Sequence, residues 1–487
     1  MNLDNFVKNL RTEMRKDAGI DGDAQRIGQL VWMLFLKIYD TLDEDWAIEK
    51  KDYVSVIPEN LRWKNWAIDN KDGKAKTGDE LLNFVNNELF ETLKNIEIDE
   101  NTPKNQLIVK EVFQEANNYM KDGINLRKVI NKINELNFES YEDRHVLGDI
   151  YEIILKELQS AGDSGEFYTP RPLTDFMAKM LNPKIGDRIA DFACGTGGFL
   201  VSALNILKDQ VVETEDEDLY NNSVYGIEKK SLPYMLCVTN MLLHEVENPN
   251  IIHGNSFDYN VKDYKEEDKF DIILMNPPYG GSENDNVKNS FPISLRTGET
   301  SDLFMAVIMY RLKQNGKAAV ILPDGFLFGA EDAKLNLKKK LLEEFNLHTI
   351  VKIPNGAFLP YTPISTNLLF FDKTTSTEEV WYYKVNPPKG RKNFTKSNPL
   401  TYNHLSDLID WWDNREVNEN SNKFSVEDII ENNYNLDLFK PSEEEIGKIY
   451  ESPKELIEEY LEEKESILNK MDLIMKDIKQ ILNFDEE

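Results

Sequence analysis

Short apolar segments alternate with helical stretches from residue 161 onward, and this alternation most constrains the fold. Several segments are apolar on both faces, which is typical of strands in a parallel sheet that helices cover. The pattern predicts an open, doubly wound α/β sheet. The expected strands are residues 188–192, 223–228, 251–253, 270–275, 317–322, 348–353 and 367–371. Ligands of such sheets lie beyond the carboxyl ends of the strands, so we expect the chemistry in the loops after residues 192, 228, 253 and 275.

The chain has a different character on either side of this sheet region. Apolar residues between Ile27 and Leu42 recur at three- and four-residue steps, as they do in residues 81–93 and 146–158, which predicts an α-helical domain over residues 1–160. The α/β domain is expected over residues 161–415, and a helical tail over residues 416–487. In that tail an apolar heptad seam runs from Ile457 to Ile481 and is interrupted once, by Lys464. The seam indicates either a coiled-coil contact with a partner or packing onto the same protein.

The composition excludes several classes of protein. Hydrophobic residues make up 40% of the chain, which excludes a mainly disordered protein. The 57 basic and 87 acidic residues leave a formal charge of −30, which disfavours unaided binding to a phosphate backbone. Two cysteines and no long apolar run indicate a cytoplasmic protein without a disulfide framework or a membrane span. The five histidines form no short ligand cluster, so no metal is predicted.

The first loop expected to carry chemistry is a glycine turn. A strand runs into Gly195, Gly197 and Gly198, and a helical stretch follows. Glycines allow the backbone to approach a ligand closely, and the amides of a helix start favour negative or polar ligand atoms. It is not a phosphate loop, and Leu200 stands at the third glycine position of the dinucleotide fingerprint. Alone, the turn fits either a ligand site or a tight structural turn.

Glu228 places a carboxylate at the end of the next expected strand. A carboxylate there can accept hydrogen bonds from both hydroxyls of a ribose. The glycine turn and this acidic strand end together predict a nucleoside ligand, without saying which one.

The loop after residue 275 reads Asn276-Pro277-Pro278-Tyr279 and predicts the reaction. Two prolines restrict the backbone, so the Asn276 amide oxygen and the Pro277 carbonyl become fixed acceptors suited to an amine with two hydrogens. Acceptors on both protons localise the nitrogen lone pair as the amine attacks, which is a preorganised electrostatic effect. Tyr279 offers a flat face on which a base can stack, a contact worth about 1–3 kcal/mol.

These motifs resemble those of the amino-group methyltransferases that use S-adenosylmethionine. Gly165-Glu-Phe-Tyr-Thr-Pro-Arg171, before the glycine turn, is similar to the cofactor segment of the modification subunit of type I restriction-modification systems, which are DNA adenine methyltransferases. The resemblance extends over most of the chain and includes residues 30–39, 322–328 and 434–437. It implies a Rossmann-like methyltransferase sheet that ends in an antiparallel strand.

The resemblance also implies S-adenosylmethionine as the cofactor and assigns residues to it. Asn276 to Tyr279 would hold the flipped adenine, and Asn255 stands where such families often have an Asp that meets the cofactor adenine. The residues expected to bind the cofactor are Glu166, Phe167, Tyr168, Thr169, Pro170, Arg171, Asp191, Gly195, Thr196, Gly197, Gly198, Glu228, Asn255 and Ser256.

The expected reaction is transfer of the sulfonium methyl group to the N6 amine of an adenine flipped out of duplex DNA. A covalent route through a Pro-Cys nucleophile is not expected, because Ala193 precedes Cys194 and Leu236 precedes Cys237. Two alternatives stay open: a methyltransferase that acts on protein glutamine, whose amide suits the same acceptors, and a catalytically silent scaffold.

The family also implies partners, namely two such subunits with one DNA-specificity subunit, and a restriction subunit in the full complex. Double-stranded DNA would then be bound through the complex, which fits the charge of −30. The basic segment over residues 389–396 either touches DNA or forms a solvated hairpin.

Truncation after Pro453 tests the heptad seam. If the seam is a partner contact, the shortened chain should keep a folded core but lose most of its co-elution with a specificity subunit, because one half of the coiled coil is missing. Size-exclusion chromatography of the co-produced proteins measures this, and unchanged co-elution would contradict the coiled-coil interpretation.

Overall fold

The computed structural model describes residues 3–51, 53–69, 75–98, 102, 104–136, 151, 168–359, 364–388, 390–395 and 397–439. The chain divides into two compact units, residues 1–436 and 437–487, and every helix and strand named below belongs to the first. The heptad seam, and residues 146–158 except Tyr151, lie outside the described residues.

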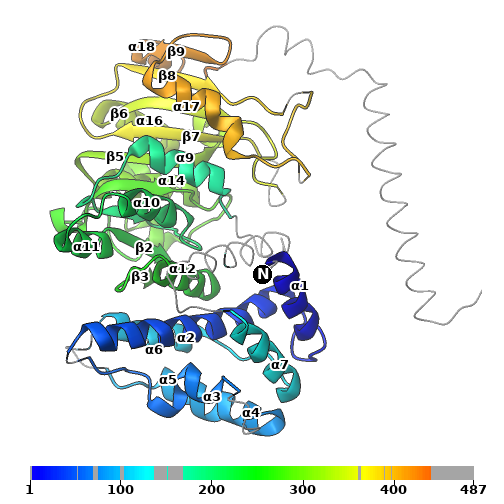
Figure 1. Cartoon of the computed structure of the whole chain (residues 1–487). Helices are drawn as coiled ribbons and strands as arrows, with labels where there is room; N and C mark the ends of the chain where they lie inside the picture. Colours follow the sequence, from blue (N-terminus) through cyan, green and yellow to red (C-terminus); the bar gives the residue numbers. More distant parts are fainter. Residues whose placement is uncertain are drawn as a thin grey trace, which may run out of the picture. The chain divides into compact units, whose positions relative to one another are not determined.

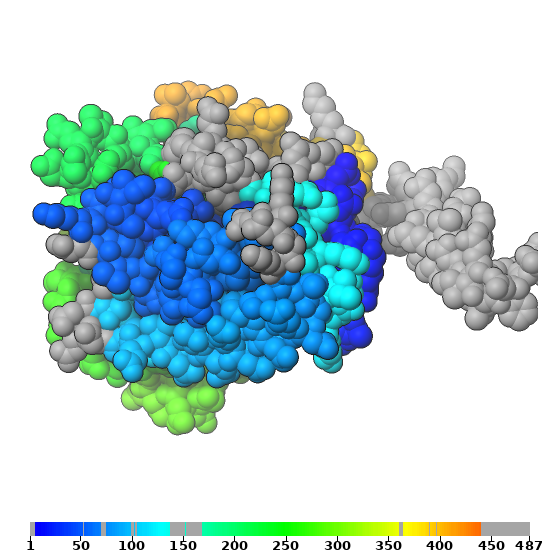
Figure 2. Space-filling view, turned by 60° about the horizontal axis from the view of Figure 1, so that its bottom comes forward, coloured from blue at the N-terminus to red at the C-terminus, as the bar shows by residue number. Residues whose placement is uncertain are grey.

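The N-terminal part is helical, as predicted. Its elements are α1 (Leu3–Met14), α2 (Asp23–Glu49), η1 (Glu59–Leu61), α3 (Trp63–Trp66), α4 (Gly78–Phe84), η2 (Val85–Leu89), α5 (Phe90–Lys94), α6 (Lys104–Glu115) and α7 (Gly123–Asn134). The long helix α2 is the centre of this body, because it is buried on almost every side from Ile27 to Tyr39. Trp32 of α2 makes edge contacts with Phe90 and Phe113, at centroid distances of 5.1 and 6.5 Å. In Figure 2 the blue and cyan residues of these helices form one continuous surface.

The strands of the described residues form one nine-stranded sheet in the order β3-β2-β1-β4-β5-β7-β6-β8-β9 (Figure 1). They are β1 (Ile189–Asp191), β2 (Val224–Glu228), β3 (Asn250–His253), β4 (Phe270–Met275), β5 (Leu312–Pro323), β6 (Asn346–Ile353), β7 (Thr366–Asp372), β8 (Glu379–Lys384) and β9 (Ser421–Ser425). The block from β3 to β5 is parallel, and β7 runs antiparallel to both β5 and β6. This is the expected doubly wound sheet with its antiparallel strand.

Helices connect the strands and place them. From β1 the chain steps outward to β2 and β3, whereas from β4 it steps the other way to β5, so right-handed crossovers put the connecting helices on opposite faces. The helices are α9 (Arg171–Leu181), α10 (Gly198–Lys208), α11 (Thr214–Asn221), α12 (Ser231–Leu243), α13 (Asp285–Lys288), α14 (Thr300–Arg311), α15 (Asp324–Phe328), α16 (Asp332–Glu344), α17 (Ser406–Asp413) and α18 (Val426–Glu431). Three 3-10 turns, η3 (Glu266–Asp268), η4 (Ile293–Leu295) and η5 (Tyr402–Leu405), complete the described elements.

Two strands were not predicted from the sequence. β8 pairs in parallel with β6, and β9 forms the antiparallel edge next to β8. The sheet therefore continues beyond residue 415, into the range expected for the tail, and the boundaries at residues 160 and 415 remain predictions. β9 reads Ser-Asn-Lys-Phe-Ser, a polar edge strand without the apolar run by which the other strands were recognised.

The helices from α1 to α7, here called the helical body, contact the sheet region through α12. The Tyr234 hydroxyl donates to the Glu111 carboxylate at 2.7 Å, and the Ser231 hydroxyl donates to the carboxylate of Glu115. Both acids lie on α6, whose other end approaches the loop before β3 where the Asn105 amide N–H donates to the Asn248 side chain at 3.2 Å. The start of α12, three residues after Glu228, is therefore held by the helical body.

A substitution at Gly226, in the middle of β2, tests how closely the sheet packs under the glycine turn. A Cβ at this position would lie 2.9 Å from Cys194 Sγ and 2.9 Å from Ile251 Cδ1. We expect Gly226→Ala to lower the free energy of unfolding by about 1–3 kcal/mol, the usual cost of overpacking a core. Urea denaturation measures it. The control is Gly325→Ala in α15, where a Cβ meets open space and stability should not fall; an equal loss in both variants would contradict the packing argument.

Candidate functional site

The predicted site residues come from loops at one edge of the sheet. β1 pairs in parallel with β2 on one side and with β4 on the other. The carboxyl ends of these three strands therefore lie next to each other, and the loops after Asp191, Glu228 and Met275 share one edge. This pairing brings together Asp191 and Met275, which are 84 positions apart in the sequence.

The glycine turn has the backbone that its residues require. Gly195 and Gly197 have φ values of 53° and 83°, in the left-handed region that side chains rarely adopt. A Cβ on Gly197 would also lie 2.9 Å from Cys237 Sγ, whereas one on Gly195 would meet nothing within 4 Å. The turn leads directly into α10, which begins at Gly198. The space at Gly195 thus lies beside the first amides of a helix, as a polar ligand would need.

Glu228 connects the glycine turn to the end of β2. One carboxylate oxygen accepts from the Gly195 amide at 2.9 Å, and the other accepts from the Lys230 amide at 2.8 Å. The residue is only 9% exposed, and the two hydrogen bonds fix its carboxylate. Each carboxylate oxygen can accept more than one hydrogen bond. The Glu228 carboxylate, although fixed beside the turn, can therefore still accept from a ligand hydroxyl.

Asp191 is fully buried beneath the same turn. Its Oδ1 accepts from the Ala193 amide at 3.0 Å. Burial, together with the nearby charge of Glu228, raises the pKa of Asp191 to about 8. Asp191 is thus mostly protonated at neutral pH, and it can then both donate and accept.

Cys194 lies in the turn and does not have the environment of a nucleophile. Its Sγ is 3.7 Å from that of Cys237, and both cysteines are buried and free. The contact with Cys237 and burial raise the pKa of Cys194, which disfavours the reactive thiolate.

The loop after β3 is held by its own side chains. Asn255 Oδ1 accepts from the Phe257 amide at 3.2 Å, and the Ser256 hydroxyl donates to the Phe192 carbonyl after β1. Ser256 thereby connects this loop to the glycine-turn loop. The Asn255 side chain caps its own turn, and its contact with a cofactor adenine remains a prediction.

The segment before α9 lies against the glycine turn. Arg171 Nη1 donates to the Gly198 carbonyl at 2.8 Å, and Pro170 is the residue before α9. Tyr168 and Thr169 immediately precede it, whereas Glu166 and Phe167 lie outside the described residues. The predicted cofactor segment and the predicted glycine turn are therefore in direct contact.

The Asn276 amide stands at the end of β4 with both of its polar atoms bonded. Its Nδ2 donates to the Thr169 hydroxyl at 2.9 Å, and its Oδ1 accepts from the Tyr279 hydroxyl at 2.5 Å. Pro277 is buried and Pro278 is exposed, and burial raises the pKa of Tyr279. The sequence predicted Asn276 as an acceptor for a ligand amine; the contacts with Thr169 and Tyr279 were not predicted.

One further polar residue at the site was missed. Asn240 of α12 is buried, and its Nδ2 donates to the Thr196 carbonyl in the glycine turn at 3.0 Å. A signal existed, because Asn240 is an amide inside the apolar run from Tyr234 to Leu243. A buried amide in such a run needs a partner.

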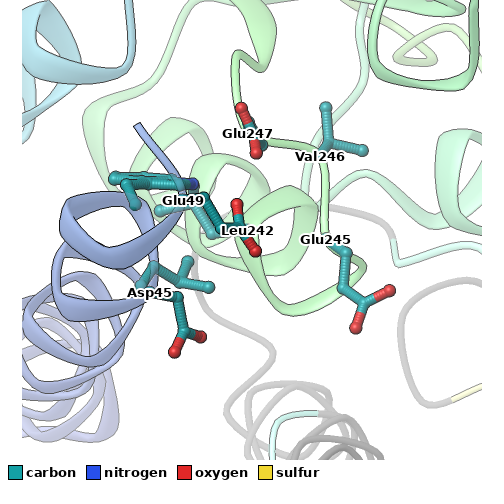
Figure 3. A pocket seen from close by; sticks show the side chains of 8 residues that line it. Asp45, Glu49, Leu242, Glu245, Val246 and Glu247 are labelled. Atoms are coloured by element: carbon teal, nitrogen blue, oxygen red, sulfur yellow. The ribbon is translucent and has the colours of Figure 1, made fainter. Parts of the chain in front are cut away.

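A cavity of about 190 Å³ lies elsewhere, between α2 and the end of α12 (Figure 3). It is lined by Leu42, Asp45, Trp46, Glu49, Leu242, Glu245, Val246 and Glu247. Glu247 pairs with Lys50 at 2.7 Å, and Glu245 pairs with Lys208. None of the predicted site residues lines this cavity, and the Lys50–Glu247 pair joins α2's end to the segment after α12 beside it.

Two kinds of feature are absent from the described ranges. No group of three or more His, Cys, Asp or Glu side chains there could hold a metal ion. Among the helices of those ranges, none is both long and apolar enough to cross a membrane.

Comparison with known families agrees with this architecture. The family model of the N-6 DNA methylases matches residues 142–448, and the model of the HsdM N-terminal domain matches residues 3–133. The methylase subunit of the type I restriction enzyme EcoEI from Escherichia coli is 48% identical over 469 residues, which cover 94% of each chain. The StySPI methylase subunit of Salmonella potsdam is 29% identical over 78% of this chain and 70% of its own.

Solved structures give the same result. A crystal structure from Vibrio vulnificus YJ016, described as a type I modification subunit, is 40% identical with a TM-score of 0.79 and covers 88% of this chain and 92% of its own. A chain from a study of complex assembly in the type I restriction-modification system is 32% identical, with a TM-score of 0.81 and 99% of both chains covered.

The fold is that of a methyltransferase. The chain belongs to the N-6 DNA methylase family and, within it, to the methylase subunits of type I restriction enzymes, which makes it an adenine-specific DNA methyltransferase. Family membership favours DNA over the protein-amide alternative.

Asp191 makes stability at this site depend on pH. Its folded pKa of about 8 lies above the ordinary value near 4, so the folded chain binds the proton more tightly and the free energy of unfolding should fall as pH rises between those values. Asp191→Asn removes this dependence, and its stability relative to the natural chain should rise by up to ~1.4 kcal/mol per pH unit.

Urea denaturation at pH 5, 6, 7 and 8 measures the difference. Asp218→Asn, on the exposed side of α11, is the control, and its difference from the natural chain should stay constant with pH. A constant difference for Asp191→Asn as well would show that Asp191 is ionised in the folded chain.

Proposed function

We propose that this chain transfers the methyl group of S-adenosylmethionine to the N6 amine of an adenine flipped out of double-stranded DNA. The observation that carries this proposal is the position of the Asn276 amide, at the end of β4 and bonded to Thr169 of the cofactor segment. Arg171 of the same segment contacts Gly198 of the glycine turn, so the predicted base site and the predicted cofactor site share one wall.

The residues of the turn fit the proposed cofactor. The space above Gly195 and the amides at the start of α10 suit the polar methionine end, and the carboxylate of Glu228 suits a ribose. Tyr168 to Arg171, Asp191, Gly195 to Gly198, Asn255 and Ser256 would complete the site, with Glu166 and Phe167 expected to join them. When bound, S-adenosylmethionine supplies an electrophilic methyl group on its sulfonium.

The chain's own residues would prepare the amine for attack. The Asn276 amide oxygen and the Pro277 carbonyl would accept its two hydrogens, which localises the nitrogen lone pair in the transition state. The ring of Tyr279 would stack on the base. No strong base is needed among residues 276–279, because the proton that the amine loses on gaining the methyl group can pass to water.

We also propose that the chain acts within a cytoplasmic complex. A net charge of −30 disfavours DNA binding by the chain alone, so a separate specificity subunit would select the site and hold the DNA. Two copies of this chain would assemble with one specificity subunit, and a restriction subunit would join the full complex. The relatives named as type I methylase subunits, and the related chain from the study of complex assembly, support a place in such a complex but carry no count of its subunits.

Asn276→Ala tests the acceptor role. We expect methylation to fall at least ~100-fold, comparable with the loss of a preorganised oxyanion donor, whereas S-adenosylmethionine binding should be retained because the glycine turn and Glu228 are unchanged. Tritium transfer to DNA, with the specificity subunit co-produced, measures the first effect, and calorimetry measures the second.

The matched control is Asn60→Ala, an exposed amide of the helical body that bonds to Glu88. It should methylate at the rate of the natural chain. Normal turnover by Asn276→Ala would refute the acceptor role, and loss of cofactor binding in that variant would show a structural effect instead.

A further inference from the structure

The acceptor oxygen of Asn276 already accepts one hydrogen bond from a side chain of the same loop. The Tyr279 hydroxyl donates to Oδ1 at 2.5 Å, and the Thr169 hydroxyl accepts from Nδ2 at 2.9 Å. Asn276 and Tyr279 are both half-buried, so an unmade hydrogen bond at this amide would carry a desolvation cost. The arrangement satisfies the amide before any base arrives.

The hydrogen bond to Thr169 determines which polar atom of the Asn276 amide is left as an acceptor. With Nδ2 bonded to Thr169, the carbonyl side of the amide lies toward Tyr279. An adenine amine carries two hydrogens and a delocalised lone pair, so it needs an acceptor and not a second NH2 group. Thr169 therefore acts as a positioning residue for the acceptor in addition to its place in the cofactor segment.

The Tyr279 hydroxyl and an adenine amine would donate to the same oxygen, and although an amide oxygen can accept two hydrogen bonds, each donor makes it a weaker acceptor for the other. The ring that bonds Oδ1 through its hydroxyl edge must also turn its flat face to a base if it is to stack on it. We propose that the Tyr279 hydroxyl is a placeholder for the target amine, and that adenine entry exchanges this internal hydrogen bond for the amine hydrogen while the ring moves onto the base. This inference rests on the proposed function. It adds which group bonds the acceptor oxygen before the base binds.

A placeholder reduces the apparent affinity for the base, because molecules in which the hydroxyl still bonds Oδ1 offer the amine a weaker acceptor. It also protects the acceptor from other donors until a base that can both stack and donate is present. Removal of the hydroxyl should therefore tighten productive binding, by about two- to tenfold for one neutral hydrogen bond.

Tyr279→Phe is the direct test, because it keeps the ring and removes only the hydroxyl. The full chain is co-produced with its specificity subunit, and the recognised site is first identified by sequencing methylated DNA. We expect the KM for DNA to fall two- to tenfold, and the kcat measured with it reports any effect on the chemical step. Tyr220→Phe is the matched control, since its hydroxyl donates to the His244 carbonyl at 2.9 Å away from the site, and it should leave both parameters unchanged.

A second measurement separates the exchange from a general effect of the substitution. Duplexes carry either adenine or unsubstituted purine at the target position, and their affinity is measured by fluorescence anisotropy. Purine can stack on the ring but has no 6-amino group to replace the hydroxyl on Oδ1, so Tyr279→Phe should tighten binding of the adenine duplex more than that of the purine duplex.

The outcomes separate this inference from the function on which it rests. If the natural complex methylates DNA but Tyr279→Phe has an unchanged or raised KM, or tightens both duplexes equally, the placeholder is overturned and the methyltransferase function stands. If the natural complex transfers no methyl group to DNA, the proposed function fails, and this inference fails with it.

Discussion

The parallel pairing of β1 with both β2 and β4 is the constraint on which the site depends. It sets the ends of three strands side by side, so that a glycine turn, a carboxylate and an amide meet at one edge of the sheet. The hydrogen bond from the Gly195 amide to Glu228 joins the first two, and the hydrogen bond from Asn276 to Thr169 joins the third to the segment before α9. Loss of the register at β1 would therefore separate all three.

The helical body contributes to this edge without carrying a predicted site residue. Glu111 and Glu115 of α6 bond to Tyr234 and Ser231 at the start of α12, which follows Glu228 by three residues. His253 at the end of β3 lies 3.5 Å from Glu115 and stacks on Tyr234. The loops after β2 and β3 are thus supported from outside the sheet, which gives the N-terminal domain a physical role in shaping the candidate cofactor site.

Much of the fold and of the candidate site could be predicted, because the sequence patterns that indicate them extend over only a few residues. Apolar runs marked seven strands, Gly195 and Gly197 marked a turn with positive φ, and the prolines marked a rigid loop after Asn276. β9 was missed because its residues are mostly polar, whereas β8 was missed although Val380 to Tyr383 is a short run of β-branched and aromatic residues. The partner of Asn276 could not be predicted, because Thr169 is 107 residues away and its hydroxyl carries no pattern that identifies a neighbour.

The sequence by itself determined the kind of sheet, the order of its motifs and the chemistry that each motif can perform, because periodicity, glycine and proline act over a few residues. Only the tertiary structure decided that Asp191 is buried enough to raise its pKa, that Glu228 is fixed to the turn, and that Tyr279 occupies the oxygen expected to await a ligand. Those properties depend on dielectric surroundings and on distances between separate loops. Both arise only once the strands have paired and water has been removed from between them.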